Sequence, residues 1–598
     1  MRHGHPELDT VSGRHLDWRL FRRFVAMVRP YRGQAVIALG LLPFIAGVKL
    51  AQPYLIKLLI DNHIVPGTLD GFAGLALLFL LALLGESLLL FAQGYLVQAV
   101  GQRIMADLRR QGFRRLLRLP TAFFDRHPSG RLVTRLTSDV ENVGELFGAG
   151  VIASVGDIVT LIGIVTAMFW LSPNLTLVAL AVVPPLLIIL YLFRRNMRDA
   201  MRQVRARLAG LNAFIAERIA GIGEVRLFGQ QRRTLDEFET LQNDYRDSTF
   251  RTIEWDAALY SLVEVLSALA IAAILWQGGG EVLTGIAGFG TLVAFIEYVQ
   301  KFFIPLRDLS AKYSVLQASN ASLERIFELL DEPEETVGSE TYPQGPGEVR
   351  FAGVSFSYDG KTPVLKGLDL HIGPGERVAL VGATGSGKST LTRLLLRFYR
   401  PSAGHIFIDG IDIDELDPAE VRRRIGWVSQ EPFLFAGTLR ANLDPAGILD
   451  DAALRALLAD CGLEEVAERL GGLEGMLSER GRNLSSGERQ LLCLARALAS
   501  DPALLILDEA TSRLDSLSEE RVEAALNRAG RARSILLIAH RLRTAAGADR
   551  IYVLHRGSVA EVGGHRELLA QGGLYARLWR LQELNGEPEE TAGDEVQR

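Results

Sequence analysis

Long apolar stretches separated by polar segments characterise the first half of the chain. Six of these stretches are long enough to cross a lipid bilayer, which takes about 20 residues at about 1.5 Å each in an α-helix. One such stretch alone is compatible with a buried helix of a soluble protein, but six within one half of a chain favour membrane spans. The predicted spans cover residues 35–60, 72–100, 147–171, 175–193, 257–276 and 286–304.

The positions of the basic residues predict how these spans are oriented. The segments after spans one, three and five contain no lysine or arginine, whereas the connections after spans two and four are rich in arginine. Because basic residues are retained on the cytoplasmic side, both termini are expected in the cytoplasm. Residues 18–29 intersperse apolar side chains with arginines, as in a helix that lies in the membrane interface.

The two long connections predicted in the cytoplasm, residues 101–146 and 194–256, are too polar for lipid but keep helical apolar spacing. We therefore expect the membrane helices to continue beyond the bilayer. Short breaks at residues 127–130 and 221–223 interrupt the two patterns. We expect these breaks to expose small loops or helices on which a soluble domain can dock.

The pattern changes after an acidic linker rich in proline and glycine. Short β-rich runs at residues 348–356, 377–381, 504–507 and 534–538 are separated by helical stretches, which predicts a sheet covered by helices. The fold class is thus an all-α, six-helix transmembrane domain followed by an α/β domain. The predicted boundaries are 1–33 for the N-terminal segment, 34–328 for the transmembrane domain, 329–347 for the linker, 348–585 for the α/β domain and 586–598 for an acidic tail.

Composition and charge narrow the class of protein. With 48% apolar residues and a net charge of −5, the chain is neither disordered nor collagen-like, and the charge argues against nucleic-acid binding. Cys461 and Cys493 are the only cysteines. They are too few for a disulfide framework or a zinc site, so we expect two buried thiols.

The first chemical motif is a glycine-rich loop that follows the apolar run 378–381. It fits the pattern G-x-x-x-x-G-K-S, in which the backbone curls around phosphates with its N–H groups inward. Lys388 supplies a compact positive charge in a chain with only seven lysines, and Ser389 can ligate Mg²⁺. The residues of this phosphate loop are Gly382, Ala383, Thr384, Gly385, Ser386, Gly387, Lys388 and Ser389.

A second motif consists of two adjacent carboxylates at the end of the apolar run 504–507. Asp508 is placed to bind a metal ion through water, and Glu509 to polarise the water that attacks a phosphate. Acidic residues at a strand end are often only solvated, but here they share a domain with a phosphate loop. The pair therefore predicts nucleotide hydrolysis.

The order of these motifs resembles that of ATP-binding cassette (ABC) exporters of type IV in their half-transporter form. The resemblance covers nearly the whole chain and implies an ATPase-coupled transporter that uses ATP and Mg²⁺. It also implies roles for further residues: Tyr358 stacks on adenine, Thr390 completes the ATP site, Gln430 senses metal and water, Asp515 lies in the cross-dimer loop and His540 contacts the γ-phosphate. The family's signature, which caps ATP held by the opposing subunit, corresponds to Leu484, Ser485, Ser486, Gly487 and Glu488.

Two departures from the family pattern bear on assembly. The usual signature L-S-G-G-Q has Ser486 in place of its first glycine and Glu488 in place of its glutamine. A side chain then lies where bare backbone approaches phosphate, and an acid adds charge near an anion. An altered signature in a chain that retains Glu509 resembles one chain of a heterodimeric exporter. We therefore favour a different partner chain, with an intact signature and a degenerate Walker B motif, the motif that here ends in Asp508 and Glu509. A symmetric homodimer is the alternative.

Ionisable residues within the predicted spans are candidates for the substrate path. An excess of deep acids suits cationic amphiphiles and thus a multidrug exporter; the alternative is that these acids pair across helices. Other possibilities are a lipid or lipid-linked flippase that works as a homodimer, an ATP-gated channel and a regulatory membrane module. We expect a multi-pass protein of a bacterial inner membrane, in contact with membrane lipid, with its ATPase domain in the cytoplasm. The candidate residues are Glu86, Asp157, Glu264 and Glu297.

Overall fold

The computed structural model describes residues 18–338, 340, 342, 345–508, 522–526, 533–539 and 541–584. The chain divides into two compact units. The membrane unit comprises residues 1–117 and 128–332, and the ATPase unit comprises residues 118–127 and 333–598. The short segment 118–127 therefore belongs to the second unit although both of its neighbours in the sequence belong to the first.

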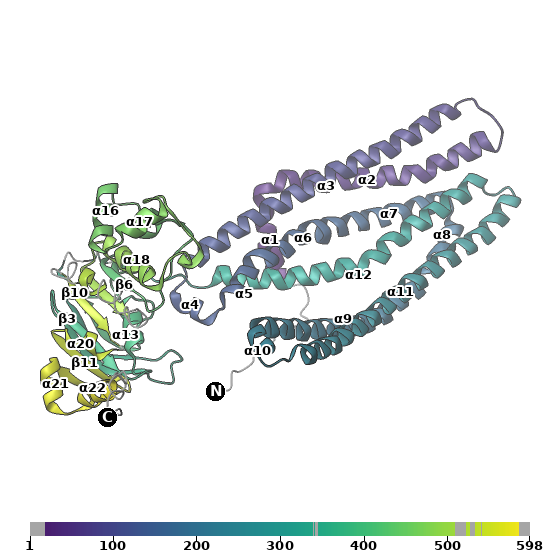
Figure 1. The fold of residues 1–598 in the computed structure, drawn as a ribbon. Coiled ribbons are helices and arrows are strands. Elements are labelled where there is room, and N and C mark those ends of the chain that lie inside the picture. Colours follow the sequence, from purple (N-terminus) through teal and green to yellow (C-terminus); the bar gives the residue numbers. More distant parts are fainter. Residues whose placement is uncertain are drawn as a thin grey trace. The chain divides into compact units, whose positions relative to one another are not determined.

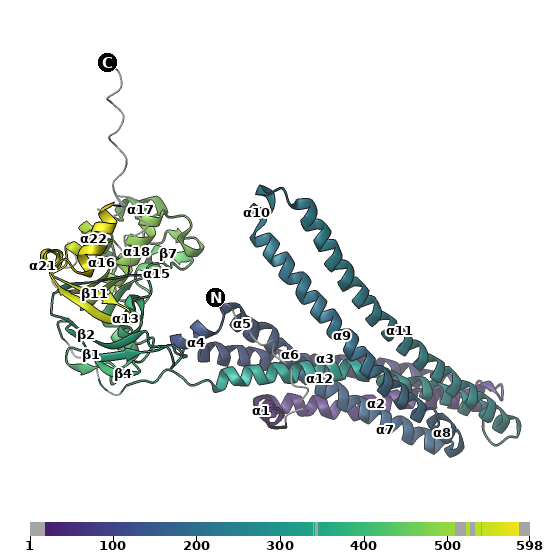
Figure 2. The same cartoon turned by 90° about the horizontal axis from the view of Figure 1, so that it is seen from below.

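The membrane unit is entirely helical in the described residues. Long helices run side by side, with α2 packed along α3 and α9 along α11 (Figures 1 and 2). Its helices are α1 (Trp18–Val28), α2 (Arg32–Leu59), α3 (Phe72–Leu116), α5 (Ser129–Thr134), α6 (Val140–Glu145), α7 (Ala153–Leu171), α8 (Pro173–Leu180), α9 (Val183–Ala220), α10 (Ile222–Leu227), α11 (Gln231–Leu283) and α12 (Phe289–Asp331). Segments of π-helix connect some of them: η2 (Ile60–Ile64), η3 (Arg135–Asp139) and η4 (Leu146–Ile152).

Within the described ranges, six helices are long and apolar enough to cross a membrane, which confirms the six predicted spans. The helices also extend well beyond the apolar stretches, as the spacing in the connections predicted. Helix α3 continues to Leu116, and α9 continues to Ala220. Helix α12 ends only at Asp331, so it extends 27 residues beyond the predicted end of the sixth span at Ile304.

A buried ion pair joins the extension of α12 to the segment that precedes α6. The Arg325 guanidinium donates two hydrogen bonds to Asp139, 2.9 Å from Nε to Oδ2 and 2.5 Å from Nη2 to Oδ1. Ser322 donates to the same carboxylate at 2.9 Å. Because the Asp139 side chain is 6% exposed, these donors compensate a charge that water does not reach.

Replacing Arg325 with methionine should therefore destabilise the membrane unit. The R325M variant leaves Asp139 buried and charged without its main partner, which costs about 3 kcal/mol of unfolding free energy. We expect a lower midpoint of thermal denaturation in detergent, and a smaller loss in the double variant R325M/D139N because the uncompensated charge is gone. Equal losses in the two variants would contradict this role.

The ATPase unit is built on two main sheets, some of whose strands are labelled in Figures 1 and 2. An antiparallel sheet has the order β2-β1-β4-β5, and a six-stranded sheet has the order β12-β11-β3-β10-β9-β6, in which only β12 is antiparallel to its neighbour. The strands are β1 (Val349–Phe356), β2 (Leu365–Ile372), β3 (Arg377–Gly382), β4 (Ala403–Ile408), β5 (Ile411–Asp412), β6 (Ile425–Val428), β7 (Gly437–Thr438), β8 (Met476–Leu477), β9 (Leu504–Asp508), β10 (Ser534–Ile538), β11 (Arg550–His555) and β12 (Ser558–Gly563). The predicted strand runs agree with β1, β3, β9 and β10 to within one residue at each end.

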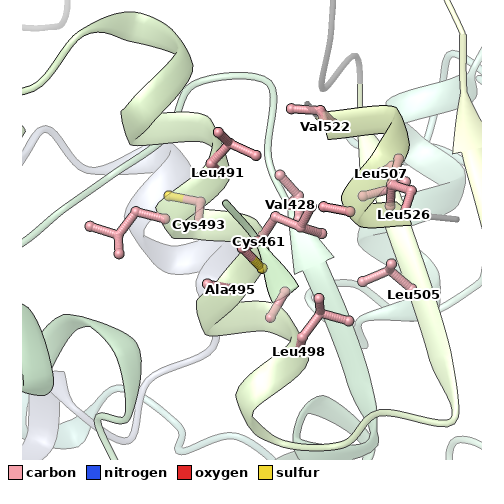
Figure 3. Close-up of a cluster of buried hydrophobic side chains, with 14 of the residues drawn as sticks. Val428, Cys461, Leu491, Cys493, Ala495, Leu498, Leu505, Leu507, Val522 and Leu526 are labelled. Atoms are coloured by element: carbon pink, nitrogen blue, oxygen red, sulfur yellow. The ribbon is translucent and has the colours of Figure 1, made fainter. Parts of the chain in front are cut away.

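Helices cover the six-stranded sheet, and a large apolar core lies between them and the strands. Figure 3 shows part of this core, in which side chains of α18 pack against β6 and β9. Cys461 and Cys493 are both buried in it as thiols outside any disulfide, as predicted, and burial raises the pKa of Cys493. The helices of this unit are α4 (Thr121–Arg126), α13 (Lys388–Leu395), α14 (Pro418–Arg424), α15 (Leu439–Leu443), α16 (Asp451–Asp460), α17 (Glu464–Leu470), α18 (Ser486–Ala499), α20 (Leu542–Ala546), α21 (His565–Gln571) and α22 (Leu574–Leu584).

Candidate functional site: the carboxyl edge of the parallel sheet

The register of the parallel strands brings the predicted nucleotide-binding segments to one edge. Ile538 at the end of β10 lies beside both Leu380 of β3 and Asp508 of β9. Val428 at the end of β6 lies beside Leu507. The phosphate loop that follows β3, the acidic end of β9 and the segment after β6 therefore emerge together, as expected for a ligand site in an α/β sheet.

The phosphate loop has the backbone conformation that its glycines allow. Gly385 and Gly387 have φ of +80° and +109°, which side-chain-bearing residues rarely adopt. Lys388 is buried at the start of α13, and its Nζ donates to the carbonyl oxygen of Gly382 at 2.7 Å. Ser386 Oγ is buried without a hydrogen-bond partner among the described residues. A buried lysine and an unpartnered hydroxyl at a helix N-terminus suit a bound phosphate.

Tyr358 lies beside this loop and rests on an aromatic platform formed by Phe356 and Tyr399. Its ring is half exposed and packs edge-on against Phe356 and Tyr399, with ring centroids 4.8 and 5.0 Å away. Its hydroxyl lies 3.1 Å from the hydroxyl of Thr390 in α13, and the Arg393 guanidinium lies over the same ring, 6.0 Å from the centroid. The ring is thus held in place with room for a flat partner such as a nucleotide base.

Helix α4 is attached to the platform on which Tyr358 rests. Tyr399 donates from its hydroxyl to the Asp125 carboxylate at 2.6 Å, and Arg393 lies 3.5 Å from the same carboxylate. Burial and the bond to Asp125 raise the pKa of Tyr399 to about 12. This contact helps to explain why α4 belongs to the ATPase unit.

The signature segment forms the N-terminus of α18. Ser485 caps the helix, since its hydroxyl accepts from the Glu488 N–H at 3.2 Å while the Glu488 carboxylate accepts from the Ser485 N–H at 2.8 Å. Arg469 of α17 lies 2.9 Å from the other carboxylate oxygen, and this bond lowers the pKa of Glu488. The acid is thus neutralised within its own subunit, contrary to the expectation that it adds net charge near an anion.

Breaking this pair should produce a pH-dependent loss of stability. Glu488 is stabilised in its charged form, so its contribution is present above its unfolded pKa of about 4.3 and is lost as the pH falls through the lowered folded value. R469M should lower the free energy of unfolding only slightly at neutral pH, because Arg469 is largely exposed. Denaturant titrations should show this difference from the parent protein at pH 7 and a smaller one at pH 3. A pH-independent difference would assign Arg469 another role.

Several predicted site residues lie outside the described part of the chain or lack a described geometry. Glu509, Asp515 and His540 are outside the described residues. Gln430 and Asp508 lie at the strand edge, and each has an interaction whose partner is not described. Ser389 follows Lys388 in α13 and is exposed.

Two of the deep acids in the membrane unit are paired. Glu86 on α3 accepts a hydrogen bond from the Gln52 amide and lies 3.9 Å from the Lys49 ammonium. Asp157 on α7 forms an ion pair with Lys312 of α12. Both acids thus agree with the alternative interpretation, in which deep acids pair across helices and do not line a substrate path. Lys312 is absent from the predicted spans because the apolar pattern ends before it.

The other two candidates for the substrate path have no such partners. Glu264 is exposed on α11, and Glu297 is half-buried on α12. Neither carboxylate forms a hydrogen bond or a close ion pair within the part of the chain that the structure describes. Among the described residues, Glu86 and Asp157 thus have close partners and Glu264 and Glu297 have none.

Sequence reasoning did not find three residues that hold the site together. Asp125 lies just before the first break, but nothing in the sequence indicates that its partner is Tyr399, which lies 274 residues away. Arg469 is one of many arginines, and only the folded chain places it beside Glu488.

Comparison with known proteins agrees with this geometry. The family pattern of the ABC transporter transmembrane region matches residues 36–306, and the family pattern described as ABC transporter matches residues 365–512. A protein of Bacillus subtilis named a probable multidrug resistance ABC transporter ATP-binding/permease protein is 36% identical over 499 residues, 82% of this chain and 74% of that protein. An ATP-dependent lipid A-core flippase of Chromobacterium violaceum is 35% identical over 572 residues, 95% of this chain and 98% of the flippase.

A solved structure shares the fold over almost the full length. It is that of a bacterial Atm1-family ABC exporter with ATP bound, which is 26% identical with a TM-score of 0.77 and covers 94% of this chain and 99% of its own. The chain therefore belongs to the ABC transporter family. It has half-transporter architecture, with one transmembrane and one ATP-binding domain fused, and is an ATPase-coupled transporter of the exporter type. The predicted family and fold class are confirmed.

Proposed function

We propose that this chain is one half of a dimeric exporter that moves amphiphilic small molecules across a bacterial inner membrane by alternating access. The observation that carries the proposal is the attachment of α4 to the ATPase unit through Asp125. The chain enters and leaves α4 from the membrane unit, so movement of the ATPase unit upon ATP binding pulls directly on the membrane helices. In this proposal the ATPase unit and both termini lie in the cytoplasm.

The ATP site has a role for each predicted residue. Tyr358 stacks on adenine, Thr390 supports it, and the phosphate loop 382–389 surrounds the phosphates. Ser389 and Gln430, with Asp508 through water, hold Mg²⁺, while Glu509 and His540 act on the attacking water and the γ-phosphate. Asp515 and the signature 484–488 act across the dimer on ATP bound by the partner. A chain with one phosphate loop and one signature needs a second chain to complete either site.

The partner in this proposal is a different half-transporter chain with an intact signature. The pairing of Glu488 with Arg469 leaves Ser486, exposed in the first turn of α18, as the departure that matters. Its hydroxymethyl group occupies space where the family has a bare glycine. One ATP site of the dimer is then impaired, and the site built from this chain's phosphate loop is competent.

Expression of the chain alone tests the heterodimer. We expect weak dimerisation and low ATP hydrolysis, and both should rise when a half-transporter chain with an intact signature is expressed with it. The measurement is light scattering of the purified protein together with its ATPase rate in nanodiscs. A stable homodimer with full ATPase activity that drugs stimulate would overturn the heterodimer and leave the exporter itself intact.

Replacing Glu509 with glutamine tests the hydrolytic role. A general base contributes about 100-fold or more to such a reaction, so E509Q should lower the ATPase rate by at least that factor. ATP binding should remain within about twofold of the parent, because the phosphate loop is unchanged. Hydrolysis at the parental rate would remove this role from Glu509.

The unpaired acids favour cationic amphiphiles as substrates. Neutralising one of them removes an attraction worth about 1 kcal/mol, so E264Q and E297Q should each raise the dye concentration for half-maximal transport by roughly fivefold. E86Q is the matched control, because the substituted side chain keeps an amide oxygen that can accept from the Gln52 amide. Transport of a cationic dye into inverted vesicles gives the measurement, and unchanged transport in both test variants would assign them structural roles.

A lipid flippase that works as a homodimer is the second candidate. It is favoured by the 35% identity to a lipid A-core flippase over 95% of the chain. Translocation of lipid in reconstituted vesicles, with no transport of drugs, would support the flippase.

A further inference from the structure

Helix α2 contains a proline, Pro53, within a membrane span. Pro53 has no N–H, so the carbonyl oxygen of Lys49, four residues earlier, loses its normal helical partner. Pro53 is buried within the membrane unit. Lipid supplies no hydrogen-bond donor to a freed carbonyl, so neighbouring helices have to provide one.

Lys301 of α12 provides that donor. Its ammonium group lies 3.2 Å from the Lys49 carbonyl oxygen and 2.9 Å from the side-chain oxygen of Gln52. Lys301 lies 12 residues into α12, and Lys49 lies 10 residues before the end of α2. At 1.5 Å per residue Lys301 is about 18 Å from the start of α12 and Lys49 about 15 Å from the end of α2, and both lie within the apolar spans.

Two further contacts join α12 to α2 between this level and the loop ends. The Tyr298 hydroxyl donates to the Leu50 carbonyl at 2.6 Å, and this tyrosine is 1% exposed. At the loop end, Asp61 accepts from the Gly290 N–H at 2.6 Å and so caps the first turn of α12. A Cβ atom at position 290 would lie 2.5 Å from the Lys57 carbonyl oxygen, so the two backbones touch here.

We propose that Lys301 is a positioning residue of the transport cycle, whose ammonium group pins α12 to the carbonyl that Pro53 frees in α2. This contact between the Lys301 ammonium group and the Lys49 carbonyl oxygen, called the pin below, holds the outer halves of the two helices together. Gln52 extends it to α3, because the same amide that accepts from Lys301 donates to Glu86. The inference rests on the alternating access proposed above, since opening to the outside requires the pin to release.

The chemistry of the site explains why lysine serves this purpose. The acceptors are a single carbonyl oxygen and an amide oxygen, which suit a compact ammonium group better than a flat guanidinium fork. Both acceptors are neutral, and no carboxylate of the described residues forms a close ion pair with Lys301. Such a contact stabilises one arrangement of the helices and still breaks during a cycle.

The test is a double-mutant cycle in which the distance between two spin labels is measured. Spin labels at L69C and I286C, both exposed at the loop ends, report the separation of α2 and α12 in nanodiscs, while the two native cysteines are buried. Loss of a charged hydrogen bond changes an equilibrium by roughly 10- to 100-fold. K301M should therefore raise the ratio of separated to closed ends by at least about tenfold without nucleotide.

The P53A substitution makes the test specific. Alanine at this position supplies the missing N–H to the Lys49 carbonyl, so K301M should have a clearly smaller effect in the P53A background. Pro43 of the same helix is the matched control, and P43A should not reduce the effect of K301M. K301R keeps a donor and should remain closer to the parent than K301M. An unchanged distance in K301M, or equal effects of K301M with and without P53A, would overturn the pin.

Two further measurements distinguish a variant that fails to fold from a failure of the pin, and a failure of the pin from a failure of alternating access. If K301M is not recovered from membranes, recovery of K301M/P53A supports the pin, and loss of both variants overturns it. Adding ATP and Mg²⁺ to the labelled parent tests alternating access independently of the pin. Labels that never separate with ATP, together with an intact substitution cycle, would contradict the proposed opening and leave the pin as a structural contact.

Discussion

A lipid bilayer offers no hydrogen-bond partner to a peptide group, and this constraint shapes the larger part of the molecule. It explains why the described part of the membrane unit has helices and no strands, and why the carbonyl freed by Pro53 has a donor on a neighbouring helix. Lysine is rare in this chain, yet four of the seven lysines lie on α2 and α12. The structure gives each of the four a carboxylate or a carbonyl within reach: Lys49, Lys57, Lys301 and Lys312.

The ATPase unit follows a different constraint, because its ligand site depends on strand order. Parallel strands deliver the phosphate loop, the segment after β6 and the acidic end of β9 to one edge. The same unit includes α4, which reaches the aromatic platform of Tyr358 through Asp125 and Tyr399. The aromatic platform of the candidate site is thus attached to a segment that the chain enters and leaves from the membrane unit.

Local sequence patterns predicted the elements well because each pattern reports one physical requirement. Apolar runs about 20 residues long indicated the spans, and the phosphate loop was recognisable because its glycines and lysine are close in sequence. The pairs that decide the geometry were not predictable, since their members are far apart: Arg325 with Asp139, Lys312 with Asp157, and Lys301 with the carbonyl freed by Pro53. In a chain with many arginines and acids, composition does not reveal which charges meet.

The placement of α4 has a consequence for synthesis. This helix leaves the ribosome 274 residues before Tyr399, its partner in the ATPase unit. At 5–20 residues per second that interval lasts roughly 14–55 s, during which the membrane helices around α4 are made but its own docking site does not exist. In that interval Asp125 lacks the tyrosine hydroxyl that it accepts from in the finished protein. The nascent chain thus carries an incomplete contact until the ATPase unit folds onto it, which makes this segment a natural point for a chaperone to act.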